Sequence, residues 1–94
     1  MKLAEAVGIR TKELLFKKNI TQYRLTKLTC LNEKTISDIL HGRTSDIKFS
    51  TIYLISNAFN ISIQEFLNSP IFDMNNLEIW KFSTINQKSK YLFF

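Results

Sequence analysis

The most informative segment of the sequence is TQYRLTKLTCLNEKTISDILHG, residues 21–42. Its apolar residues recur at helical spacing and predict two short helices, over residues 21–29 and 33–41, joined by about three residues. Thr21 and Asn32 stand where each helix begins, and their side-chain oxygens can accept a hydrogen bond from a free amide of the first turn. Gly42 is a natural residue for ending the second helix.

Two short helices with so brief a link have the spacing of a helix-turn-helix. In that motif the first helix lies across the DNA backbone, and the second presents its amino-terminal end to base edges in the major groove. The positions that pack the two helices together are apolar, namely Leu25, Ile36 and Ile39. The outward positions of the second helix all carry hydrogen-bonding groups, namely Glu33, Lys34, Ser37 and Asp38. An ordinary helical hairpin can show such a face by chance, so spacing alone leaves both interpretations open.

The helical pattern continues on both sides of this stretch. A helix is expected over residues 3–18, ended by Asn19, which tolerates the left-handed conformation. Another is expected over residues 49–59, ended by Asn60, and its inward stripe is Phe49, Ile52, Ile55 and Phe59.

A last short helix is expected after Ser62. Ser62 and Glu65 have the spacing of a capping box, in which the hydroxyl and the carboxylate each bond the other residue's amide. This helix must stop before Pro70. The sequence therefore predicts an all-α fold of five helices.

The composition agrees with one small helical domain. The chain has 94 residues, about the size of one domain. Its 2 Gly and 1 Pro are fewer than a turn-rich β-sandwich needs. The single cysteine, Cys30, cannot form an internal disulfide, which favours a reducing, cytoplasmic location. No run resembles a signal peptide or reaches 18 apolar residues, so no membrane association through a span is expected.

The net charge is +5, and its distribution is uneven. Residues 10–48 hold nine Lys or Arg against four acidic residues, whereas residues 49–80 hold three acidic residues and no Lys or Arg. Residues 81–94 hold three Lys and no acidic residue. A basic region favours an anionic partner without identifying it, and the alternative is an ordinary solvated surface.

The run 21–42 closely resembles the repressor/Cro-like helix-turn-helix family, often called the XRE family. The landmarks are Thr21-Gln22, Leu25, Thr35-Ile36-Ser37, Ile39 and Gly42. The resemblance covers about residues 3–70, with five helices in register. It implies a compact, lambda-repressor-like DNA-binding domain over residues 1–72, followed by an extension over 73–94. It also implies a homodimer that binds double-stranded DNA, usually at a palindromic operator.

The resemblance assigns roles to nine residues of this sequence. Glu33, Lys34 and Asp38 match base-reading positions, with Ser37 close to them. Lys34 would favour guanine, and the two carboxylates would accept from the cytosine amino group. The other five would bond the phosphate backbone or cap the recognition helix: Gln22, Asn32, Thr35, Arg43 and Thr44.

Four of these residues have a plainer alternative. Gln22 can be a surface residue of a first turn, and Glu33 favours a helix amino terminus through the helix dipole alone. Asp38 can simply pair with Lys34 four residues earlier. Arg43 can be part of a solvated loop.

The sequence departs from the family pattern at the turn and at a packing position beside it. Cys30 occupies a turn position usually held by Gly, which commonly needs a positive φ. Thr26 stands where Ala is usual, and its hydroxyl is expected to bond the Gln22 carbonyl.

A second departure is a matched pair. Leu15 and Leu40 replace an Arg and a Glu that form an ion pair in many relatives. We expect the two leucines to touch, since an apolar pair avoids the desolvation of a buried ion pair.

These observations favour a sequence-specific transcriptional regulator of bacterial or phage type, a repressor. The alternative is a protein-interaction module of the same fold, such as an antitoxin that holds its partner. The chain has one His, one Cys and no Gly-rich phosphate loop, so we expect neither an enzyme nor a metal or cofactor site.

The extension over 73–94 is rich in aromatic residues, among them Trp80, Phe82, Tyr91, Phe93 and Phe94. So many aromatic side chains are costly to leave in water. Three interpretations stay open: the extension packs back onto the domain, forms a dimer interface, or is disordered.

Overall fold

The computed structural model describes residues 1–73 and 75–77. In this part of the chain every regular secondary-structure element is a helix, and turns and loops connect them. Its elements are α1 (Leu3–Lys18), α2 (Gln22–Thr29), α3 (Glu33–Leu40), α4 (Phe49–Ala58), α5 (Ile63–Leu67) and the 3-10 turn η1 (Pro70–Phe72). The expected five-helix, all-α fold is confirmed. The third and fourth helices each end one residue earlier than expected, because His41 and Phe59 are their C-caps. The interpretations of the aromatic side chains from Trp80 onward lie outside the described residues.

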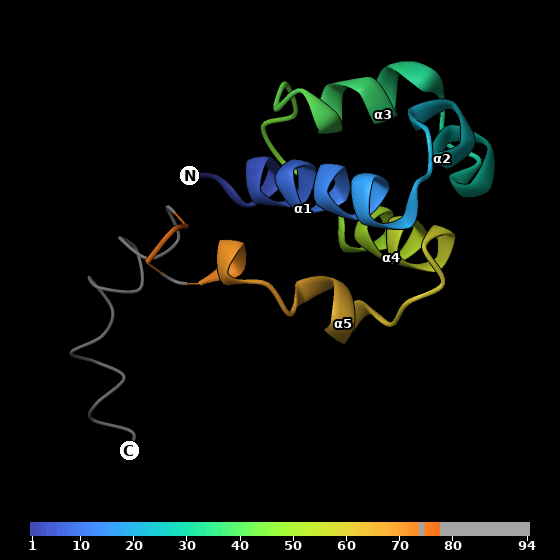
Figure 1. Ribbon diagram of the computed structural model, residues 1–94. Helices are drawn as coiled ribbons and strands as arrows, with labels where there is room; N and C mark the ends of the chain where they lie inside the picture. Colours follow the sequence, from blue (N-terminus) through green and yellow to red (C-terminus); the bar gives the residue numbers. More distant parts are fainter. Residues whose placement is uncertain (74, 78–94) are drawn as a thin grey trace.

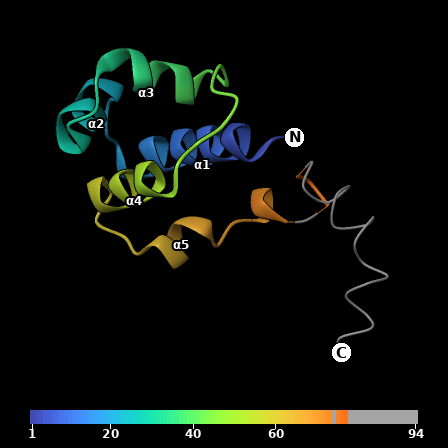
Figure 2. The same cartoon turned by 180° about the vertical axis from the view of Figure 1, so that it is seen from behind.

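The long helix α1 runs between two groups of elements (Figures 1 and 2). It packs against α3 on one side and against η1 on the other. Helix α2 packs against both α3 and α4, and α4 packs against α5. Helix α3 therefore lies on the outside of the molecule, with α1 beneath it and α2 packed beside it (Figure 1).

The core is apolar and draws on all five helices. Its members are Val7, Leu14, Leu25, Ile36, Ile39, Leu40, Ile52, Ile55, Phe59 and Phe66. The expected inward stripe of α4 is correct from Ile52 onward but wrong for Phe49, whose side chain is 66% exposed. Phe49 is the first residue of α4, and its side chain points largely into solvent.

The helix ends follow the sequence closely. The Thr21 hydroxyl accepts from the Arg24 amide at 3.1 Å, and the Ser62 hydroxyl accepts from the Glu65 amide at 3.0 Å. The second bond of the expected capping box, from the Ser62 amide to the Glu65 carboxylate, is not formed, and Glu65 is exposed. Asn19 and Asn60 adopt the left-handed conformation, with φ of 55° and 59°.

The turn between α2 and α3 is as predicted. Cys30 is left-handed, with φ of 61°. The Thr26 hydroxyl donates to the Gln22 carbonyl at 3.0 Å.

Leu40 is buried, and Leu15 is half-buried against the core cluster that contains Leu40. Neither leucine is exposed, as the apolar replacement of an ion pair requires.

At Gly8 the backbones of α1 and α3 lie close together. A Cβ atom at this position would come within 2.2 Å of the Ile39 carbonyl oxygen. From the sequence, Gly8 only weakens the first helix, because glycine is a poor helix former. In the structure, the missing side chain of Gly8 leaves room for the backbone of α3.

Arg10 is buried inside the domain and does not belong to a basic DNA-facing surface. Its Nε donates to the Phe66 carbonyl at 2.8 Å, and its Nη2 donates to the Glu65 carbonyl at 2.9 Å. Its Nη1 pairs with the Glu13 carboxylate. Arg10 therefore satisfies carbonyl groups at the end of α5 and ties that helix to α1. Arg10 is one of the nine basic residues between positions 10 and 48. Because it is buried, its charge is not available to an anionic partner.

Candidate nucleic-acid interface

The predicted recognition helix α3 has one buried and one outward face. Ile36, Ile39 and Leu40 are buried beneath it. Glu33 and Lys34 are exposed at its amino-terminal end, and Ser37 and Asp38 are half-buried one turn further on. The buried face fixes how the helix is rotated, so the polar residues face away from the domain.

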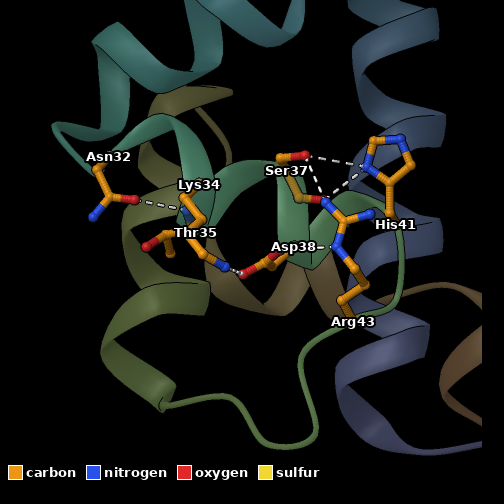
Figure 3. A network of polar contacts seen from close by, with 7 residues as sticks. All are labelled: Asn32, Lys34, Thr35, Ser37, Asp38, His41 and Arg43. Carbon is orange, nitrogen blue, oxygen red and sulfur yellow. Dashed lines mark hydrogen bonds and ion pairs between the residues drawn. The ribbon is translucent and has the colours of Figure 1, made fainter.

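The amino-terminal end of α3 is fixed by its cap. The Asn32 side-chain oxygen accepts from the Thr35 amide at 2.7 Å (Figure 3). This is the capping role that the sequence predicts for Asn32. The bond uses an amide that would otherwise lack a partner within the helix.

A network of polar contacts covers the outward face of α3 (Figure 3). Asp38 is at its centre: its Oδ2 accepts from Lys34 Nζ at 2.9 Å, and its Oδ1 accepts from Arg43 Nε at 2.9 Å. Arg43 Nη2 also donates to the Ser37 hydroxyl at 2.9 Å. The pairing of Asp38 with Lys34 is therefore present, and Arg43 is a second partner that the sequence analysis did not include.

The backbone at the end of α3 explains how Arg43 reaches this face. The Arg43 amide donates to the Asp38 carbonyl at 2.8 Å, and the Gly42 amide donates to the Ile39 carbonyl at 3.3 Å. With Gly42 left-handed at φ of 69°, these bonds form a Schellman motif. That motif places the residue after the glycine beside the third-last residue of the helix, here Asp38. Gly42 was thus the signal in the sequence that predicts the Arg43–Asp38 contact.

The two cations favour the charged form of Asp38. Hydrogen bonds from Lys34 and then from Arg43 hold the pKa of the Asp38 carboxyl below its ordinary value of 3.8. At neutral pH the face therefore carries a carboxylate between two cations.

His41 closes the network at the end of the helix. Its Nδ1 lies 2.8 Å from the Ser37 carbonyl oxygen. Because a carbonyl oxygen can only accept, Nδ1 carries the proton in this contact. The side chain is exposed, in line with its expected place at a helix end.

The remaining predicted residues line two shallow hollows beside α3. Gln22 and Glu33 share one hollow with Tyr23 and Thr26, between the first turns of α2 and α3. Thr35 and Thr44 share the other, whose lining also includes Ile39, Asp46, Ile47, Lys48 and Thr51.

The nine predicted residues are therefore gathered on and around α3. Lys48 is an exposed cation beside two of them that the sequence analysis did not single out. The signal for it was a basic residue in the loop directly after the recognition helix.

The chemistry available here is hydrogen bonding and charge, not metal binding. Within residues 1–73 and 75–77, no group of three or more His, Cys, Asp or Glu side chains is arranged to hold a metal ion. None of the helices in the same residues is long and apolar enough to cross a membrane. A polar helix face on an exposed helix-turn-helix is suited to the edges of bases and to phosphates.

Comparison with known proteins decides the family. Residues 10–70 match the Cro/C1-type helix-turn-helix (HTH) DNA-binding domain. The chain belongs to this family. It is therefore a DNA-binding regulatory protein and not an enzyme, and the resemblance to repressor/Cro-like proteins is confirmed. No curated protein and no solved structure matches the chain at a significant level.

Proposed function

We propose that this protein is a transcriptional repressor that recognises a specific sequence of double-stranded DNA, with α3 in the major groove. The observation that carries the proposal is the two-sided character of α3. Its inward residues are buried in the core, and its outward residues form a connected set of donors and acceptors. Base edges in the major groove present a distinct pattern of such groups for each base pair.

The first turn of α3 suits direct contact with bases. Lys34 is exposed and can donate to the acceptors of guanine, and the neighbouring Glu33 can accept from the cytosine amino group. Gln22 lies beside Glu33 at the amino terminus of α2 and can donate to a phosphate. Thr35 and Thr44, with their hollow next to Lys48, are suited to the backbone on the other side of the helix.

The proposed active form is a homodimer on a palindromic operator. The recognition helix is only eight residues long and can read only a few base pairs. A dimer doubles the site and makes it palindromic, with half-sites about 34–36 Å apart. Such a dimer bound over a promoter would exclude the polymerase, which is why repression is proposed.

Selection from a random pool of DNA duplexes tests the proposal, with Lys34→Ala carried in parallel. We expect the wild-type chain to enrich a palindrome. Lys34→Ala should lose preference at one base position in each half-site, by a factor of about five or more. Lys12→Ala is the control, because it removes one positive charge from an exposed position of α1. It should leave the base preferences unchanged.

If the selection enriches no sequence, and binding varies only with the salt concentration, sequence-specific recognition is contradicted. That outcome would favour the second candidate, a protein-binding module such as an antitoxin. Phe49 and Tyr53 support that candidate. They lie one turn apart on α4, with side chains 66% and 50% exposed.

A further inference from the structure

Arg43 is held over the outward face of α3 by three bonds. Its amide bonds the Asp38 carbonyl, its Nε bonds the Asp38 carboxylate, and its Nη2 bonds the Ser37 hydroxyl. The guanidinium is thus oriented although its side chain is 56% exposed. A surface arginine that needs only its charge has no use for such a fixed orientation.

The guanidinium keeps part of its donor set free. An arginine head carries five N–H donors in a planar fork. Asp38 and Ser37 take one from Nε and one from Nη2, and Nη1 has no bond within the described residues. Three N–H groups therefore remain on a plane that Asp38 and Ser37 hold in place. Guanine offers two neighbouring acceptors, O6 and N7, that match such a fork.

The adjacent carboxylate argues against a phosphate as the ligand of this arginine. Asp38 is ionised and lies 2.9 Å from Arg43 Nε, so it offsets the positive charge that a phosphate would meet. Guanine O6 and N7 carry no net charge, and they depend on the direction of the donors more than on the charge behind them. The same carboxylate that weakens a phosphate site therefore orients a base-reading one.

We propose that Arg43 reads a guanine in the major groove, and that Asp38 and Ser37 are positioning residues that hold its guanidinium toward the base. Asp38 then acts through Arg43 and does not itself accept from a cytosine. This inference rests on the proposed function, because it requires α3 to lie in the groove.

The test measures base preferences at every position of the enriched site for the full chain and four variants. Arg43→Ala removes the fork, and Arg43→Lys keeps the charge without it. Asp38→Asn removes the carboxylate charge at nearly constant volume, and the double variant combines Arg43→Ala with Asp38→Asn. Thermal unfolding of each variant checks that it is folded.

The proposal expects one shared G·C position. Preference there should fall about fivefold or more in Arg43→Ala and also in Arg43→Lys. Asp38→Asn should weaken the same position, and the double variant should be no worse there than Arg43→Ala alone. Arg43→Lys should keep the salt dependence of binding, because its charge is unchanged.

Two outcomes overturn the inference while leaving the proposed function intact. A uniform loss of affinity in Arg43→Ala with a smaller salt dependence, restored by Arg43→Lys, would assign Arg43 to a phosphate. A change of preference in Asp38→Asn at a different base position from that of Arg43→Ala would assign Asp38 to a base of its own. Failure of the wild-type chain to enrich any site would instead contradict the proposed function itself.

Discussion

Three residues of the described chain that are not glycine adopt a left-handed backbone: Asn19, Cys30 and Asn60. Asparagine tolerates this conformation, whereas most other side chains make it costly by about 1–2 kcal/mol. Cys30 is the one that its residue type does not explain. Its side chain is exposed, and its sulfur makes only a weak contact, 3.9 Å from the Lys27 carbonyl.

Replacing Cys30 with glycine is therefore expected to stabilise the domain. Glycine removes the clash at positive φ, and the gain should be about 1 kcal/mol. In a domain of this size that corresponds to a rise in melting temperature of several degrees, roughly 4–8 °C. Cys30→Ala is the control, since it removes the thiol but keeps the Cβ atom. A melting temperature for Cys30→Gly at or below that of Cys30→Ala would contradict strain at this position.

Asp38 makes a second prediction at the scale of one residue. Its pKa is lower in the folded chain than its ordinary value. At a pH above the ordinary pKa, the ionised carboxylate therefore stabilises the folded state. This contribution is lost as the pH falls through the lowered pKa. A titration followed by NMR should give a midpoint for Asp38 below 3.8. Lys34→Ala should raise that midpoint at least as much as Arg43→Ala, because the Lys34 bond has the larger effect. A midpoint unaffected by either substitution would show that the network does not persist in solution.

At the scale of elements, the position of α3 depends on how closely α1 approaches it. Gly8 lies under the Ile39 carbonyl, with no room for a Cβ atom. Gly8→Ala is expected to destabilise the domain by about 1–3 kcal/mol, the usual cost of overpacking. In an exposed helix the same change would stabilise by about 1 kcal/mol, so the sign of the effect is informative. Urea unfolding measures it, with the exposed neighbour Ile9→Ala as control.

A stabilised Gly8→Ala variant would contradict the close packing of the two helices. The variant can also be destabilised and bind DNA less tightly under conditions where it is fully folded. That result would show that the α1–α3 contact positions the recognition helix as well.

Helix α5 is only five residues long, too short to be stable without tertiary contacts. Arg10 supplies two hydrogen bonds to the carbonyls of Glu65 and Phe66. Arg10→Met keeps the aliphatic stem but leaves the buried Phe66 carbonyl without its donor, and we expect a loss of about 2 kcal/mol or more. Arg10→Lys should recover part of the lost stability, because its ammonium group is still a donor. The recovery should be incomplete, because lysine lacks the fork of the guanidinium.

Lys12→Ala, at an exposed position of the same helix, is the matched control and should change stability by less than about 0.5 kcal/mol. Urea unfolding of the four chains gives the comparison. An Arg10→Met variant as stable as the control would contradict the role of Arg10 in holding α5.

The helices and their ends were predictable from the sequence because the signals are local. Thr21, Asn32 and Ser62 cap helices through bonds to residues three positions on, and Asn19 and Asn60 stop them. The features that sequence reasoning missed depend on contacts between elements. Phe49 fits the inward stripe of its helix, yet its side chain is largely exposed. Arg10 was counted with the basic residues of 10–48, although two of its hydrogen bonds go to carbonyls more than fifty residues away.

The candidate site shows the same division. The composition and order of the outward face of α3 are set by helical spacing, and the Lys34–Asp38 pair follows from it. The Arg43 contact crosses the end of the helix and needs the turn at Gly42 to be known. What each predicted residue contacts on DNA stays a prediction.

At the scale of the whole molecule, the domain is built to hold one helix outward. Helix α1 lies beneath α3 and α2 packs beside it, while α5 lies on the far side of α1 (Figure 1). We propose that DNA is bound on this side, by the first turn of α2, by α3 and by the loop at residues 43–44.

Amide chemical shifts of the labelled chain, recorded while an enriched duplex is added, test this claim most directly. We expect the largest changes at residues 21–24, 32–38 and 43–44, and little change in α5 and on the exposed side of α1. A scrambled duplex at the same salt concentration should give smaller changes over the same face. Changes centred on the exposed side of α4, around Phe49 and Tyr53, or no changes with any duplex, would contradict recognition of DNA by α3.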